Sequence, residues 1–325
     1  MADNAVDRLV RAHRLRAIEL LPWVVILAAW FGFPGYLPLG SQILIMILFA
    51  LSLDLVLGYA GIVTLGHSAF FGVGSYAAGI YAARFSGEPF SGLLVAAVAA
   101  GAVGWVSGLV ILRTTGLTLL MLTLAVTSLL AEAANQATFL TGGNDGLQGV
   151  SIDPILGMFH FDMFGRTAYV YCAVLLCIGW VCVRRLVHAP FGQSLIGIRE
   201  NVTRMHAIGA PVRRRLVTVY TISAALAGVA GGLLAQTTQF VGLTVLGFER
   251  SGAVVIMLVL GGVGRLYGAF VGAALYMIAQ DQLAESDPVF WEFWIGLLLV
   301  LIVLFARGGV LGLLDRLLPL LARRR

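Results

Sequence analysis

The stretch that decides the fold runs from Ser41 to Arg84 and reads SQILIMILFALSLDLVLGYAGIVTLGHSAFFGVGSYAAGIYAAR. It holds two apolar blocks, 41–58 and 61–84, which meet at the spaced glycines Gly58 and Gly61. The two blocks have 18 and 24 residues, within the roughly 17–25 that a helix needs to cross a bilayer. Because backbone polar groups in hydrocarbon must be satisfied within their own segment, both blocks are predicted to be transmembrane helices.

The same pattern recurs along the chain. Its 325 residues are 60% hydrophobic and only 11% charged, whereas a soluble domain carries about 25% charged residues. The alternating pattern of a membrane barrel is absent from the sequence, so the predicted fold class is an all-α, polytopic transmembrane bundle. About ten spans are predicted, near 18–37, 41–58, 61–84, 91–112, 115–137, 168–187, 216–238, 250–263, 266–282 and 289–306.

The basic residues predict the orientation of the bundle. All 21 are arginines. With the N-terminus in the cytoplasm, only Arg84, Arg166 and Arg250 fall on the outer side, as the positive-inside rule predicts. The net charge of +5 then follows from topology, and no nucleic-acid partner is expected. Without lysine the chain cannot form a standard phosphate-binding loop, so it is not itself a P-loop ATPase.

The predicted organisation has three parts and two notable connections. They are a cytoplasmic tail at 1–17, a permease domain at 18–312 with a periplasmic loop at 138–166 and a cytoplasmic helix at 190–211, and a basic cytoplasmic tail at 313–325.

Glycines and polar residues gather where the block 61–84 begins. A glycine-broken helix start at Gly58, Gly61 and Gly66 could expose backbone groups to a polar solute at membrane depth; a simple interhelical turn fits the same glycines. His67 has no partners at metal-ligand spacing, which leaves a structural histidine or a place on the solute path. Asp54 is costly within a span and therefore a functional candidate, although it lies near enough to Gly58 to reach an interface.

The outer loop contains the run Thr141-Gly-Gly-Asn-Asp-Gly-Leu-Gln-Gly149. Glycine with Asn-Asp favours tight turns and left-handed backbone, which predicts a structured loop. A second interpretation makes it a surface for an external partner. Its candidate residues are Gly142, Gly143, Asn144 and Asp145.

The connection between the sixth and seventh predicted spans favours a short amphipathic helix. Apolar residues recur there at helical spacing, at Leu195, Ile198, Val202 and Met205. Two roles fit: a helix lying on lipid headgroups, or a lever that docks into another protein.

At these segments the chain resembles the M-type permeases of branched-chain amino acid importers. The resemblance covers roughly residues 40–312, in order. It rests on the segment 57–79, the loop at 141–146, the run from Phe191 to Gly232, the motif Val259-Leu-Gly-Gly-Val-Gly-Arg-Leu-Tyr-Gly268 and the final Leu304-Phe-Ala-Arg-Gly-Gly309.

The resemblance implies an import machine with divided labour. Two related permeases form the pathway, two ABC ATPase subunits use ATP and Mg, and a periplasmic binding protein delivers the solute. No cofactor and no covalent chemistry are expected in this chain. The residues matched to the family's coupling segment are Leu195, Ile198, Arg199, Glu200, Asn201, Arg204, Ala207 and Gly209. Arg204 departs from the family pattern, and so does Asp54, where asparagine is usual.

The predicted function is therefore an ABC-importer permease of the bacterial inner membrane, with branched-chain amino acids as the leading solutes. Urea, short amides and aromatic carboxylates are alternatives. A transporter working without ATPases would need several deep carboxylates, and only Asp54 is clearly placed. A membrane enzyme would need clustered histidine and acidic ligands.

Overall fold

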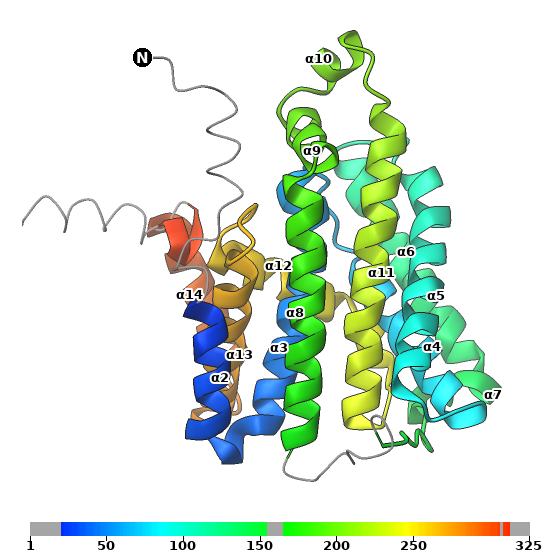
Figure 1. Cartoon of the computed structure of the whole chain (residues 1–325), viewed down its shortest axis with the longest axis vertical. Helices are drawn as coiled ribbons and strands as arrows, with labels where there is room; N and C mark the ends of the chain where they lie inside the picture. The colour runs from blue at the N-terminus through cyan, green and yellow to red at the C-terminus, as the bar shows by residue number, and fades with distance from the viewer. Residues whose placement is uncertain (1–20, 155–164, 306–307, 313–325) are drawn as a thin grey trace, which may run out of the picture.

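The computed structural model describes residues 21–154, 165–305 and 308–312 (Figure 1). Within these ranges all regular structure is helical, and the strand-like pairing is limited to an isolated antiparallel bridge between Leu147 and Val241. The predicted all-α fold class is thereby confirmed. The predicted tails at 1–17 and 313–325 lie outside the described residues.

The long helices are joined by short helical turns. In chain order the elements are α2 (Leu21–Gly32), η2 (Pro34–Tyr36), α3 (Leu37–Asp54), η3 (Leu55–Tyr59), α4 (Ser68–Arg84), α5 (Pro89–Ile111), α6 (Leu117–Gln136), α7 (Thr138–Thr141), η4 (Gly143–Asp145), α8 (Arg166–His188), α9 (Pro190–Glu200), α10 (Val202–Ala207), α11 (Val212–Thr238), η5 (Leu243–Leu246), α12 (Phe248–Gly261), α13 (Gly268–Ser286) and α14 (Trp291–Phe305).

Several of these segments are apolar and long enough to cross a membrane. In the described part of the chain five qualify: Pro34–Tyr59, Pro89–Ile111, Leu117–Gln136, Arg166–His188 and Val212–Thr238. The first, which contains α3, is mostly buried and forms the centre of the bundle. By contrast α6 buries only Leu119, Thr123 and Thr127 among its residues. Its apolar outer face suits lipid, which requires no polar cover.

Small residues bring α4, α5 and α11 into close contact. A Cβ added to Gly74 would lie 2.3 Å from the Cα of Gly228, and one added to Gly231 would lie 1.9 Å from the Phe71 carbonyl oxygen. Lipid offers no hydrophobic drive between helices, so backbone approach of this kind supplies packing energy instead. The three helices form the tightest part of the core.

Two helices begin inside the bundle. The predicted span at 61–84 is helical only from Ser68, because residues 60–67 follow an irregular path after the π-helical turn η3. Gly61 adopts a left-handed φ of 73°. The Thr64 hydroxyl accepts the Gly66 N–H at 3.1 Å, an alternative to helical hydrogen bonding. The predicted span at 250–263 corresponds to α12, which has 14 residues.

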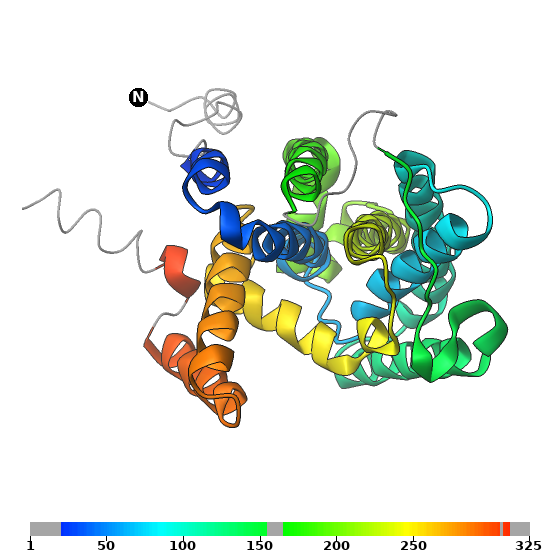
Figure 2. The ribbon, with the colours of Figure 1, turned by 90° about the horizontal axis from the view of Figure 1, so that it is seen from below.

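The starts of α4 and α12 meet. The Ser68 N–H donates to Ser251 Oγ at 2.9 Å, and the Ser251 hydroxyl donates to Ser68 Oγ at 2.7 Å. Seen along the bundle in Figure 2, α3, α8 and α11 appear nearly end-on, whereas α12 (yellow) is seen from its side. Two helices that are far apart in the sequence therefore begin next to each other within the core.

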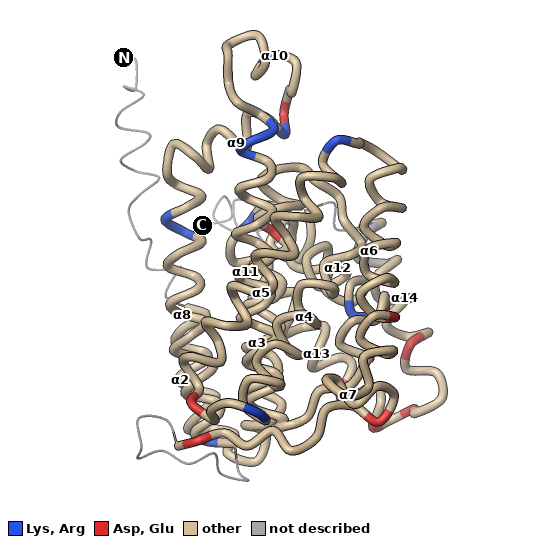
Figure 3. The backbone as a smooth tube through the Cα atoms, turned by 90° about the vertical axis from the view of Figure 1, so that its right-hand side faces the viewer, with Lys and Arg blue, Asp and Glu red and all other residues tan. Residues whose placement is uncertain are grey.

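The connections segregate to opposite ends of the bundle. Helices α9 and α10 stand at one end, and α7 lies at the other (Figure 1). Figure 3 shows charged residues of the described chain at both of these ends, with others between them near α8, α12 and α14.

Candidate solute pathway and coupling segment

The end of α3 is locked to the loop that precedes α13. The Asp54 side chain is buried, and its Oδ1 accepts the Gly264 N–H at 2.7 Å. A Cβ on Gly58 would lie 2.6 Å from the Gly264 nitrogen, so only glycine fits there. An asparagine at position 54 would accept the same bond through its side-chain oxygen. The departure from the family pattern therefore preserves the contact.

Helix α9 joins this junction through Arg199. Its Nη1 donates a hydrogen bond to the Gly58 carbonyl. A Cβ on Gly61 would lie 2.9 Å from Arg199 Cγ, so the arginine stem packs directly over the glycine. Of the predicted pathway residues, Asp54, Gly58 and Gly61 thus form a joint between α3, α9 and the loop before α13.

Gly66 and His67 lie apart from this joint, at the start of α4. The Ser52 hydroxyl donates to the Phe49 carbonyl at 2.6 Å, so His67 donates to Ser52 Oγ through Nε2 at 2.9 Å. The imidazole stacks on Phe49 with ring centroids 5.5 Å apart, and a Cβ on Gly66 would lie 2.3 Å from the Thr123 carbonyl oxygen. The packing gives both residues a structural role, and contact with solute stays a prediction.

The predicted cytoplasmic helix is broken into two. Asn201 is extended, with φ −159° and ψ 100°, and separates α9 from α10. Its side chain accepts the Arg204 N–H at 2.8 Å and caps α10. The prediction that these residues share one apolar helix face is therefore wrong. Leu195 and Ile198 are buried, whereas Val202 is 47% exposed.

The break divides the predicted coupling residues into two groups. Leu195 and Ile198 face the protein's own core, and Arg199 reaches the joint at α3. The others lie exposed around α10, namely Glu200, Asn201, Arg204, Ala207 and Gly209. Ile208 beside them is 71% exposed. Figure 1 shows α10 projecting beyond the ends of α8 and α11, where a partner could contact it.

The loop after α6 is a compact turn structure. Gly142, Gly143 and Gly146 all have positive φ, at 77°, 59° and 74°. The Leu147 N–H donates to the Val241 carbonyl at 2.8 Å, and this bond holds the loop against the segment that follows α11. The two remaining candidates, Asn144 and Asp145, are exposed. The structured loop is seen, and a partner surface at its tip stays a prediction.

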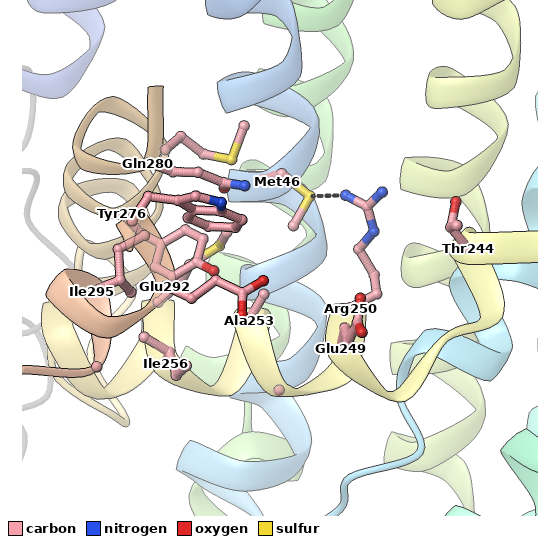
Figure 4. Close-up of a pocket in the computed structure, with 15 residues that line it drawn as sticks. Met46, Thr244, Glu249, Arg250, Ala253, Ile256, Tyr276, Gln280, Glu292 and Ile295 are labelled. Carbon is pink, nitrogen blue, oxygen red and sulfur yellow. Dashed lines mark hydrogen bonds between the residues drawn. The ribbon is translucent and has the colours of Figure 1, made fainter. Parts of the chain in front are cut away.

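A cavity of about 470 Å³ opens beside the start of α12 (Figure 4). It lies between α3, α12, α13 and α14, and its polar lining includes Glu249, Arg250, Tyr276, Gln280 and Glu292. The predicted pathway residues are not part of this lining.

The sequence alone did not indicate that Arg250 lines a cavity. The residue was expected in an outer loop, but it stands in the first turn of α12 and is only partly exposed. A usable signal was present: the arginine directly precedes Ser251 and a short, glycine-containing apolar block, which suggests a helix that begins inside the protein.

A family model matches most of the chain. The model for the branched-chain amino acid transport system / permease component matches residues 37–305. No solved structure matches the chain significantly.

Named relatives of the chain are permeases. The high-affinity branched-chain amino acid transport system permease protein LivM of Escherichia coli K12 is 25% identical, over 94% of this chain and 77% of that protein. A probable branched-chain amino acid transport permease protein LivM of Methanocaldococcus jannaschii is 23% identical, over 81% of this chain and 89% of that protein. The autoinducer 2 import system permease protein LsrC of Klebsiella pneumoniae is 28% identical, over 77% of this chain and 64% of that protein.

Proposed function

The chain belongs to the family of branched-chain amino acid transport system permease components, and on that premise we propose that it carries branched-chain amino acids as one subunit of an ABC importer. It is a multi-pass permease of the inner membrane. The solute class is taken from relatives whose names specify branched-chain amino acids. One relative is a permease for autoinducer 2, so relatives of this chain differ in their solutes. Urea, short amides and aromatic carboxylates are the alternative solutes.

The proposed assembly contains two ABC ATPase subunits, which use ATP and Mg, a paralogous permease and a periplasmic binding protein. In it, this chain has about ten spans and a cytoplasmic N-terminus. The segment 190–211 faces the ATPases, and the loop 138–166 faces the periplasm. The tails 1–17 and 313–325 lie in the cytoplasm, flanking a permease domain at 18–312.

One observation carries the proposed coupling mechanism: Arg199 of α9 is hydrogen-bonded to the Gly58 carbonyl at the end of α3. Closure of the ATPases would push the exposed α10 and move α9 with it. The Arg199 contact passes this motion to the central helix, and the bond from Gly264 to Asp54 passes it on to α13. Hydrogen-bonded elements of this kind are a physical route for coupling between distant sites.

The test is the ATPase activity of the complete importer reconstituted with its binding protein, with leucine, urea or an aromatic acid. We expect leucine to stimulate hydrolysis in the wild type and Glu200→Ala to lower that stimulation about 5-fold or more, a coupling loss of roughly 1 kcal/mol. Glu285→Ala, which removes an exposed acid at the end of α13, is the matched control and should behave as wild type.

A chain that recruits no ATPase and still moves solute would contradict the importer mechanism and favour the alternative of an ATP-independent secondary transporter. Stimulation by urea or an aromatic acid alone would retain the importer and change its solute. Equal behaviour of Glu200→Ala and Glu285→Ala would remove Glu200 from the coupling surface.

A further inference from the structure

The cavity beside α12 contains an arginine at the middle depth of the bundle. Arg250 Nη1 lies 4.0 Å from the sulfur of Met46, a residue near the centre of α3. The guanidinium also lies over the Phe71 ring, 5.9 Å from its centroid. Among the described residues no carboxylate is paired with it. In Figure 4 the Arg250 side chain extends alongside α3 from the first turn of α12.

An arginine at this depth is energetically costly and therefore calls for a functional explanation. At the centre of a span it costs about 2.5–3.5 kcal/mol on insertion scales, and such residues mark ion or substrate pathways. A sulfur and an aromatic face recover only part of that cost. The guanidinium fork matches a carboxylate in a two-point hydrogen bond, so a carboxylate is the group that this site lacks.

The beginning of α12 strengthens the same preference. The N-cap residue Gly247 makes no side-chain capping bond, and the positive end of the helix dipole, offset in part by Glu249 in the first turn, lies beside Arg250. Helices that begin at the membrane midplane present this end to anionic parts of a solute. Because Ser251 meets Ser68 within the core, the end of α12 is fixed in place before any ligand arrives.

The rest of the cavity differs from a simple anion site. Arg250 and its neighbour Glu249 come from α12, whereas Glu292 comes from α14 and lies beside Tyr276 on another wall (Figure 4). Between them the lining is largely apolar, with Met46, Ile256, Met257, Met277, Trp291 and Ile295. A guanidinium on one wall and the separate Glu292 carboxylate on another, with an apolar surface between them, suit a ligand that is negative at one group, positive at another and otherwise apolar.

We propose that this cavity binds an aliphatic amino acid in its zwitterionic form, with Arg250 on the carboxylate and Glu292 on the ammonium group. The proposal rests on the importer function proposed above and deepens it. The volume of about 470 Å³ falls in the range of small-molecule sites, roughly 300–1,000 Å³. Urea has no carboxylate and an aromatic carboxylate has no ammonium, so either would use only part of the site.

The first experiment measures uptake of labelled leucine into proteoliposomes that contain the complete importer. Arg250→Gln should lower uptake at least 10-fold, and Arg250→Lys should fall between it and the wild type, because lysine keeps the charge without the fork. Arg166→Gln is the matched control: it removes an exposed arginine at the start of α8 and should leave uptake unchanged. Equal uptake by Arg250→Gln and Arg166→Gln would overturn the proposal while leaving the importer function intact.

The second experiment needs no transport. Ala253→Cys places a thiol in the cavity wall, in a background where Cys172, Cys177 and Cys182 are replaced by alanine. Leucine should slow modification of this thiol in the purified complex. Leucinamide, which lacks the carboxylate, and 4-methylpentanoate, which lacks the ammonium, should protect at least 10-fold less well. Adding Arg250→Gln should abolish the advantage of leucine over leucinamide.

The two experiments separate the possible failures. A complex that neither hydrolyses ATP nor takes up leucine would contradict the importer function, yet protection of the thiol would still support the cavity as an amino acid site. Equal protection by leucine, leucinamide and 4-methylpentanoate, or none by any of them, would overturn the assignment of Arg250 and Glu292.

Discussion

The starts of α4 and α12 lie against each other but differ in their surroundings. Each helix begins inside the bundle, and the two are joined by Ser68 and Ser251. The polar residue before Ser68 is His67, which is 1% exposed and stacked on Phe49. The residue before Ser251 is Arg250, which lines a cavity. One junction is closed by packing and the other opens into a cavity, so we expect the first to serve stability and the second to serve binding.

The largest expected difference between the two junctions comes from adding one methyl group to each. In Gly66→Ala the new Cβ would lie 2.3 Å from the Thr123 carbonyl oxygen, which is backbone and cannot give way, whereas Gly252 has nothing within 4 Å. We expect Gly66→Ala to abolish folded yield and Gly252→Ala to be neutral or stabilising by up to about 1 kcal/mol. Yield and thermal unfolding in detergent measure both; a Gly66→Ala protein as stable as the wild type would contradict the closed junction.

A smaller effect is expected when the histidine is removed. His67→Ala loses the bond to Ser52 and the contact with Phe49, and it leaves a void in a packed region. The loss should be on the order of 3 kcal/mol, as for other large buried side chains, seen as a lower unfolding temperature. Leucine KM should stay within about 2-fold of the wild type, in contrast with Arg250→Gln. A raised KM with normal stability would move His67 onto the solute path.

The smallest effect is expected at the link between the junctions. Ser251→Ala leaves the Ser68 N–H without its acceptor in a buried site. An unsatisfied buried donor costs about 1–3 kcal/mol. Both junctions should loosen together, so faster hydrogen exchange is expected at the starts of α4 and α12 alike. Exchange that rises only at α12 would show that the two helices are held independently.

The sequence predicted the features that depend on neighbouring residues. Apolar blocks of spanning length and the glycines at Gly58, Gly61 and Gly66 are local signals, and the helical class and the break before α4 followed from them. The break at Asn201 also has a local signal, because asparagine is a common N-cap residue. The apolar spacing from Leu195 to Met205 continues across it, however, and favoured a single helix.

The cavity could not be predicted in the same way. Arg250 and Met46 are separated by 204 residues along the chain and meet only in the folded bundle. Arginine counting assigned Arg250 to an outer loop because the rule treats a basic residue as a marker of topology. The contact between Asp54 and Gly264 could not be predicted either, because these residues are 210 positions apart and meet only in the folded bundle.

The shortness of α12 has a consequence for how the protein is made. Its 14 residues fall short of the roughly 17–25 that a helix needs to cross hydrocarbon, and it carries Arg250. We expect that this segment does not partition into lipid on its own as it leaves the ribosome and needs neighbouring helices, α13 among them, to provide a protein-lined place for it. Because most of the cavity lining comes from α12, α13 and α14, the cavity is expected to be one of the last parts of the molecule to form.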